Sequence, residues 1–280
     1  MNDRTNTSHI RIAGVNKIFP TASGPLVALQ DIDLEIPPGQ FTCLLGPSGC
    51  GKSTLLNAIA GFALPSAGSI QANGRTVTGP GPERGMVFQE YALFPWMTVE
   101  ENVGFGLEIK GMPAPQIRAR VADLLTMLSL TDFRQRYPKD LSGGMRQRVA
   151  IARVLALDSP IMLMDEPFGA LDALTRRNLQ DELLRLWAEL KKTIIFVTHS
   201  IEEAIYMADR IVVMTYRPGT VKRDILVALP RPRDPAAAEF NALKRELGQL
   251  VMEEQQRHHN DELRMAVPAK AGTRSTTAMS

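Results

Sequence analysis

Cysteine is nearly absent from this chain of 280 residues, which contains only Cys43 and Cys50. Two thiols supply neither a disulfide framework nor the ligands of a structural zinc site, so we expect both to stay reduced. Long apolar runs are also lacking, since segments such as Ile161–Met164 and Thr193–Val197 are far shorter than the roughly 18 residues of a membrane span. The first residues are polar, unlike a secretory signal. These absences favour a cytosolic protein that reaches a membrane only through another protein.

An excess of either charge is lacking as well. The chain has 32 basic and 30 acidic residues, a formal net charge of +2. This balance gives no support to a nucleic-acid partner or to binding of an anionic membrane surface. Apolar residues make up 44% of the sequence, enough for a sizeable core in one large domain with a subdomain or a tail.

Apolar and polar residues alternate in the first part of the chain, and helical spacing prevails in the middle. Strands that alternate with helices in the last part predict a parallel sheet covered by helices. The expected strands are Ile10–Ile12 paired with Ala28–Ile36, Phe41–Leu45, a hairpin over Gly68–Val77, Ile161–Met164, Thr193–Val197 and Arg210–Met214. The expected helices are Ser53–Ala60, Gln116–Leu130, Met145–Ala156, Leu174–Leu190 and Ile201–Met207.

Composition divides the chain into four parts. Residues 1–9 form a polar extension, and residues 10–235 form the main domain, with a helical subdomain at about 91–157. Three prolines in Leu229–Pro235 exclude regular structure and mark the end of that domain. We expect a helix over residues 236–257 and a disordered tail over residues 258–280. The two histidines at the start of this tail are expected to be an exposed pair and not a metal site. The helix packs on its own domain or on a partner chain through Phe240, Leu243, Leu247 and Leu250.

A glycine-rich segment between a predicted strand and a predicted helix has the pattern of a phosphate-binding loop. Glycines let backbone N–H groups approach an anion, and the helix start adds the positive end of its dipole. Lys52 supplies a charge to the β- and γ-phosphates, and Ser53 supplies a hydroxyl to Mg²⁺. We therefore expect ATP and Mg²⁺ here, with nucleotide contacts from Gly46, Pro47, Ser48, Gly49, Cys50, Gly51, Lys52, Ser53 and Thr54.

A predicted buried strand ends in two carboxylates, Asp165 and Glu166. Asp165 is placed to hold Mg²⁺, and Glu166 to orient or deprotonate the attacking water. Apolar strands often end in acidic residues, so this pattern gains its weight from the phosphate-binding loop.

Ser142, Gly143 and Gly144 precede a predicted helix and indicate a second anion site. A simple helix cap would account for Ser142, but it accounts less well for two successive glycines.

These motifs together resemble those of ABC transporter ATPases, because Leu141–Met145 is similar to the signature sequence of that family. The resemblance extends from about residue 10 to residue 229, with the motifs in the family's order. It implies that Phe19 stacks on adenine, although Phe19 alone would also fit a core residue. It further implies that Gln89 contacts Mg²⁺ and the attacking water. It also implies that Asp172 lies in the D-loop and that His199 contacts the γ-phosphate. Lys52, Gln89, Glu166 and His199 are thus the expected catalytic residues, and Ser53, Gln89 and Asp165 the expected metal ligands.

The resemblance also implies an architecture and an assembly. The expected α/β fold has a P-loop NTPase (RecA-like) core, an antiparallel β subdomain and a helical subdomain that carries the signature. In the family the signature of one subunit completes the ATP site of the other, so Ser142, Gly143 and Gly144 are expected to act in trans. The implied partners are a second copy or a similar ATPase subunit, membrane permease subunits and, indirectly, a solute-binding protein, at the cytoplasmic face of the inner membrane.

Pro167, directly after Glu166, is typical of importers in this family. The closer resemblance is to the ATPases of nitrate, taurine and aliphatic-sulfonate importers, which implies ATP-driven uptake of such a small oxyanion. Tyr91–Gly106 is expected to contact the permease. The resemblance rests on Gly79–Gly85, Leu93–Trp96, Asp172–Arg176 and Leu229–Pro235.

Other functions stay open at this point. They are an ABC ATPase of another importer class, a soluble ABC ATPase without a permease, and a P-loop small-molecule kinase. A DNA-repair or chromosome-organising ATPase would carry a long coiled-coil insertion, whereas Thr54–Leu141 is short and has no sustained heptads. A kinase would not need the glycine pair. No residue of this chain selects the solute or the permease.

Overall fold

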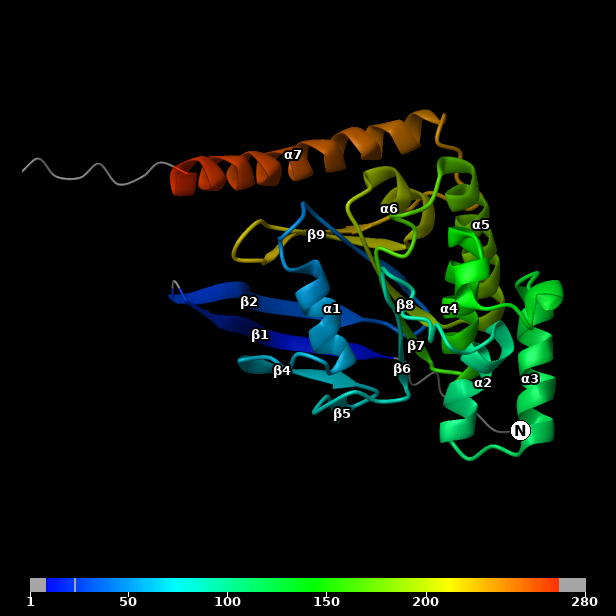
Figure 1. Ribbon diagram of the computed structural model, residues 1–280. Helices are drawn as coiled ribbons and strands as arrows, with labels where there is room; N and C mark the ends of the chain where they lie inside the picture. Colours follow the sequence, from blue (N-terminus) through cyan, green and yellow to red (C-terminus); the bar gives the residue numbers. More distant parts are fainter. Residues whose placement is uncertain (1–8, 23, 267–280) are drawn as a thin grey trace, which may run out of the picture.

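The computed structural model describes residues 9–22 and 24–266 (Figure 1). Most of the predicted extension over residues 1–9, and residues 267–280 of the predicted tail, lie outside this range. The described strands are β1 (Ile10–Thr21), β2 (Gly24–Ile36), β3 (Phe41–Leu45), β4 (Ala67–Ala72), β5 (Arg75–Thr76), β6 (Arg84–Val87), β7 (Ile161–Asp165), β8 (Thr193–Thr198), β9 (Arg210–Met214) and β10 (Val221–Leu226). The helices are α1 (Lys52–Ala60), α2 (Val99–Ile109), α3 (Ala114–Met127), α4 (Gly143–Ala156), α5 (Ala173–Leu190), α6 (Ile201–Met207) and α7 (Ala238–Ala266).

Two sheets form the centre of the described molecule. The larger has the order β10-β9-β3-β8-β7-β6, parallel except at β10, and the smaller has the antiparallel order β2-β1-β4-β5. Every residue of β3 and β8 is buried, as expected for the apolar runs of a parallel sheet covered on both faces. This arrangement confirms the predicted α/β core with an antiparallel β subdomain.

The helices α2, α3 and α4 pack together as an arm beside the larger sheet (Figure 1). They occupy most of the helical subdomain predicted at about 91–157. The sequence did not single out α2, since two glycines in it interrupt its apolar periodicity. It also did not single out β6, which is only four residues long, or β10, in which three polar residues separate the apolar Val221 from Ile225 and Leu226.

The last helix differs from its prediction. It runs from Ala238 to Ala266, beyond the expected end at residue 257, so the prediction of a disordered tail beginning at residue 258 is wrong as far as residue 266. The ring of His258 lies 4.4 Å from that of Tyr216, so it is not a free exposed side chain. Phe240, Leu247 and Val251 are buried in the main core, so α7 packs on its own domain.

The proline-rich segment before α7 is irregular, as predicted, but it is tied to the core. The Arg233 side chain is buried and donates to the carbonyl oxygens of Ile205 and Ala208, both at 2.6 Å. Burial lowers the pKa of Arg233 to about 10. These hydrogen bonds tie the segment that precedes α7 to the end of α6.

Within the described residues, no helix has the length and apolar character that crossing a membrane requires. The same part of the chain holds no cluster of three or more His, Cys, Asp or Glu side chains suited to a metal ion.

Candidate nucleotide-binding and hydrolysis site

The glycine-rich loop lies between the carboxyl end of β3 and the start of α1, as the sequence predicts. Gly51 caps α1 in a left-handed conformation, with φ of 96°, and a Cβ there would lie 2.8 Å from Leu29 and 3.0 Å from the Ala28 carbonyl oxygen. Lys52 is buried, and its ammonium donates to the carbonyl oxygens of Gly46 and Pro47, both at 2.8 Å. The loop thus holds the Lys52 ammonium beside a tightly packed turn in which only glycine fits at position 51.

A cavity of about 290 Å³ opens over this loop. It collects side chains and backbone from β1, β2, the loop, α1 and the end of β7. Its lining residues are Phe19, Leu26, Ala28, Ser48, Gly49, Gly51, Lys52, Ser53, Thr54, Glu166 and Arg217. The structure therefore brings together Phe19, most of the predicted loop residues and the predicted general base. Cys50 is instead buried behind the loop, and burial raises the pKa of its thiol, so a reactive thiolate is disfavoured.

Two of the expected magnesium ligands, Ser53 and Asp165, lie together beside this cavity. The Ser53 hydroxyl donates to Asp165 at 2.9 Å. Burial raises the pKa of Asp165, the hydrogen bond from Ser53 lowers it, and the nearby charge of Glu166 raises it. A hydroxyl beside a carboxylate is a donor set of hard oxygens that suits Mg²⁺, and such an ion would offset the repulsion between the two carboxylates.

Glu166 lies between the cavity and His199. Its carboxylate is 3.1 Å from His199 Nδ1. The backbone of Glu166 has φ of 42°, a conformation that costs a non-glycine residue free energy and is frequent at functional sites. Glu166 thus follows the end of β7 directly and lines the cavity.

A buried carboxylate that the sequence analysis missed supports His199. Glu203, on α6, accepts hydrogen bonds from the hydroxyl of Thr198 and, at 2.9 Å, from the amide of Gln180. The Thr198 hydroxyl in turn accepts from the N–H of Ser200 at 3.0 Å, so the residues on both sides of His199 are fixed. The spacing of Ser200 and Glu203, which is typical of a helix N-terminus, could have indicated it.

Gln89 lies apart from the cavity over the loop. It lines a different cavity, of about 510 Å³, together with Glu90, Tyr91, Leu93, Pro138, Arg146 and Ala170. One isolated subunit therefore does not place this predicted metal ligand with the other two.

The signature residues also lie outside that nucleotide cavity. Ser142 caps α4, accepting from the N–H of Met145 at 3.3 Å. Gly144 is buried, and a Cβ there would lie 2.6 Å from the Thr175 side chain, so tight packing on α5 gives one reason for this glycine. Asp172 caps α5, accepting from the N–H of Thr175 at 3.0 Å, and this hydrogen bond lowers the pKa of Asp172. The starts of α4 and α5 thus lie side by side.

Two arginines of α4 hold the segment that follows Gln89. Arg153 donates to the carbonyl oxygens of Ala92 at 2.7 Å and Tyr91 at 3.1 Å, and Arg146 lies over the Tyr91 ring. Burial lowers the pKa of Arg153. The signature helix and this segment are therefore joined by direct contacts.

The comparisons with known proteins agree with this geometry. Residues 29–169 match a family model described as ABC transporter. The chain is 44% identical to a nitrate import ATP-binding protein, NrtD, of Synechocystis, over 85% of this chain and 90% of the relative. It is 52% identical to a taurine import ATP-binding protein, TauB, of Roseobacter denitrificans, over 70% of this chain and 74% of the relative. A solved dimeric ATP-binding cassette in a post-hydrolysis state with ADP and Pi superposes with a TM-score of 0.70 at 33% identity, over 79% of this chain and 100% of that one.

Proposed function

Because this chain belongs to the ABC transporter family, we propose that it is the ATP-binding subunit of an importer for a small oxyanion. The observation that carries the proposal is its similarity, over most of its length, to subunits named for nitrate import and for taurine import. An importer of another class and a soluble ABC ATPase without a permease are the alternatives. A kinase is disfavoured, because the match to the ABC transporter family model, over residues 29–169, includes the signature segment.

The residues around the cavity support ATP hydrolysis, each with a distinct task. Lys52 binds the terminal phosphates, and Phe19 lies at the cavity wall where a base would stack. Ser53 and Asp165 would hold Mg²⁺, which neutralises charge on the phosphates when bound. Glu166 accepts a proton from the attacking water, and His199 holds that carboxylate in place.

The separation of the signature from the cavity supports a dimeric working unit. Ser142 and Gly143 lie at the start of α4 and line no part of the subunit's own nucleotide cavity. We infer that they complete the site of a second copy or of a similar ATPase subunit. Gln89 would join the metal ligands only in that closed assembly.

A membrane permease is the expected partner at the segment that follows Gln89. Trp96 is 70% exposed there, and its ring stacks near that of Phe94 at 5.6 Å. Large exposed aromatic side chains mark protein interfaces. The proposed location is therefore the cytoplasmic face of the membrane, peripheral through the permease, with a solute-binding protein reached only indirectly.

Reconstitution tests the proposal. The chain is combined with candidate membrane and solute-binding subunits, and uptake of nitrate, taurine and an alkanesulfonate into vesicles is measured with and without ATP. ATP-dependent uptake of one of them is expected. ATP hydrolysis without uptake of any small anion would favour another importer class or a soluble ATPase.

A further inference from the structure

The turn between β9 and β10, residues Thr215–Thr220, packs against the nucleotide loop. The N–H of Gly219 donates to the Ala28 carbonyl oxygen at 3.0 Å, and the N–H of Gln30 donates to the Gly219 carbonyl oxygen at 3.0 Å. A Cβ at position 219 would lie 2.3 Å from the Cys50 carbonyl oxygen. The turn is therefore fixed against both β2 and the phosphate-binding loop.

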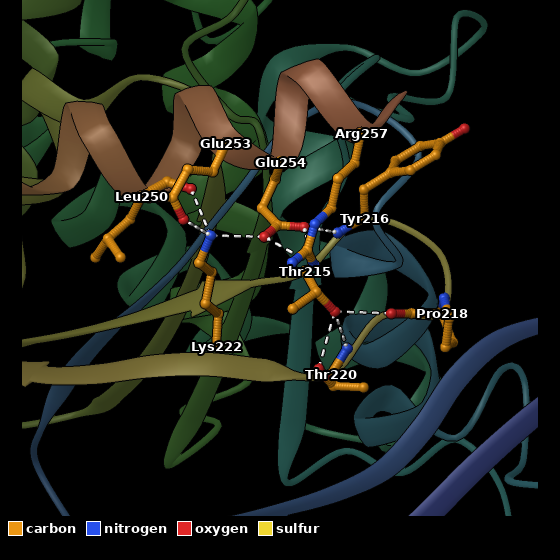
Figure 2. Close-up of polar contacts among 9 residues, drawn as sticks. All are labelled: Thr215, Tyr216, Pro218, Thr220, Lys222, Leu250, Glu253, Glu254 and Arg257. Carbon is orange, nitrogen blue, oxygen red and sulfur yellow. Dashed lines mark hydrogen bonds and ion pairs between the residues drawn. The ribbon is translucent and has the colours of Figure 1, made fainter. Parts of the chain in front are cut away.

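On its other side the same turn is held by α7 (Figure 2). Glu254 is fully buried, and its carboxylate accepts from the N–H of Tyr216 at 2.9 Å and from the Lys222 ammonium at 2.6 Å. Lys222 also reaches Glu253 at 2.6 Å and the Leu250 carbonyl oxygen at 3.1 Å. A buried carboxylate is tolerated only where such donors surround it, so Glu254 fixes the turn to α7.

The turn carries Arg217 to the nucleotide cavity. Arg217 lines that cavity, and one guanidinium nitrogen lies 3.8 Å from where a Cβ of Gly49 would be. Its guanidinium also lies 5.6 Å from the centre of the Tyr216 ring. Among the described residues, no carboxylate forms an ion pair with Arg217, which leaves its donors available to a ligand. Guanidinium groups pair with phosphate oxygens in a two-pronged geometry, so the cavity holds a second cation suited to a polyphosphate.

We propose that Arg217 binds the phosphates of the nucleotide and that Glu254 of α7 positions it by holding the turn. The proposal rests on the ATP site described above and adds two residues that the phosphate-loop pattern does not contain. Arg217 touches the ligand, whereas Glu254 acts only through Arg217. The long C-terminal helix thereby becomes part of the nucleotide site, although none of its described side chains lines the cavity.

Nucleotide affinity of the full chain tests the role of Arg217. Dissociation constants for Mg-ATP and Mg-ADP are measured for the wild type, Arg217→Ala, Arg217→Lys and the control Arg223→Ala, an exposed arginine of β10 outside the cavity. We expect roughly tenfold weaker ATP binding for Arg217→Ala, equivalent to about 1.4 kcal/mol, with a smaller loss for Arg217→Lys. The control should change affinity less than twofold, within the long-range effect of one charge.

Two outcomes separate this proposal from the one it rests on. If the wild type binds no ATP, the nucleotide site itself is refuted. If the wild type binds ATP and Arg217→Ala binds it as well as Arg223→Ala does, the role of Arg217 alone is refuted. Arg217 also lines a cavity of about 410 Å³ on the α7 side, with Arg257 and Asp261. A lowered melting temperature without a change in affinity would therefore assign its guanidinium to that side and overturn the proposal.

A double-mutant cycle tests the role of Glu254. Glu254→Gln keeps an acceptor for the Tyr216 N–H but removes the charge that attracts Lys222, so the turn should loosen. We expect Glu254→Gln to weaken ATP binding about threefold or more in the wild-type background and not at all in the Arg217→Ala background. Equal weakening in both backgrounds would show that α7 acts by another route. Lys222→Met removes the ion pair with Glu254 from the side of β10. It is used in place of Glu254→Gln if Glu254→Gln does not fold.

Discussion

At the scale of single residues, Glu166 combines a strained backbone, a hydrogen bond to His199 and a place at the cavity wall. Glu166→Gln should keep ATP binding and lower hydrolysis by roughly 10²- to 10⁴-fold, because an amide is a far poorer base than a carboxylate. Phosphate release and ATP affinity are measured on the same preparation. Glu239→Gln, an exposed carboxylate at the start of α7, serves as the control. Ordinary turnover of Glu166→Gln would refute its role as general base.

Glu203 gives a prediction about pH. Burial raises its pKa, against the hydrogen bonds from Thr198 and Gln180 that lower it. A raised carboxyl pKa means that the folded protein holds the proton more tightly than the unfolded chain does. Glu203 therefore lowers the stability of the fold as the pH rises above the ordinary pKa of glutamate, near 4.3. The free energy of unfolding of Glu203→Gln, relative to the wild type, should therefore increase from about pH 4 to about pH 7.

Denaturant titrations across that range check the sign. Glu253→Gln is a control with the opposite expected pH dependence, since the hydrogen bond from Lys222 lowers the pKa of Glu253. A carboxylate with a lowered pKa adds stability that is present above its ordinary value and is lost as pH falls, so this variant should lose stability relative to the wild type as pH rises through that value. Parallel pH profiles for Glu203→Gln and the wild type would contradict the role of burial at Glu203.

At the scale of elements, the buried parallel strands were the most predictable part of the chain. Phe41–Leu45 and Arg210–Met214 have the predicted bounds, because a continuous apolar run between turns has few alternatives. Local pattern does not report long-range contacts, which is why Glu254 and Arg217 were missed. It also missed the length of α7, which contacts the distant β9–β10 turn through Glu254 and His258.

The irregular segment that carries Trp96 is held by a residue that the sequence analysis did not identify. Asn102 is fully buried, and its side chain bonds to the N–H of Phe94 at 2.8 Å and to the carbonyl oxygens of Met97 and Thr98, both at 3.0 Å. Its amide thus satisfies a backbone that forms no regular structure. The exposed ring of Trp96 is consequently held in a defined place.

A charge at that place should disrupt the proposed permease contact. Trp96→Glu is expected to keep basal ATP hydrolysis, since the side chain is exposed, and to lose the stimulation of hydrolysis by solute in the reconstituted complex. Ile109→Glu, at a residue 74% exposed on the same helical arm, is the matched control and should behave as the wild type does. Undiminished solute stimulation in Trp96→Glu would place the permease elsewhere.

At the scale of the whole molecule, one subunit holds two half-sites that do not meet. The phosphate-binding loop faces its own cavity, and the signature at the start of α4 does not. The sequence resemblance implied this division, whereas composition and periodicity carry no information about it, because in the proposed dimer the completing residues belong to another chain.

Mixed dimers test that division. Lys52→Ala and Ser142→Arg should each abolish hydrolysis alone. A mixture should recover part of it, because a mixed dimer pairs the intact loop of one subunit with the intact signature of the other. Ser142 is exposed, whereas a side chain at Gly144 would collide with Thr175, so position 142 is the better choice. Unmixed variants at equal concentration are the control, and no recovery on mixing would indicate a site completed within one subunit.

The contacts of Arg153 and Arg146 with the segment after Gln89 have a consequence for how a change at the permease would reach the nucleotide. Through these contacts the segment that leads to Trp96 is joined to α4, and α4 begins with the signature. In the proposed dimer, a displacement at that surface would therefore be passed through α4 to the nucleotide bound by the opposite subunit. In a working transporter, each permease contact would time the hydrolysis of the ATP bound across the dimer.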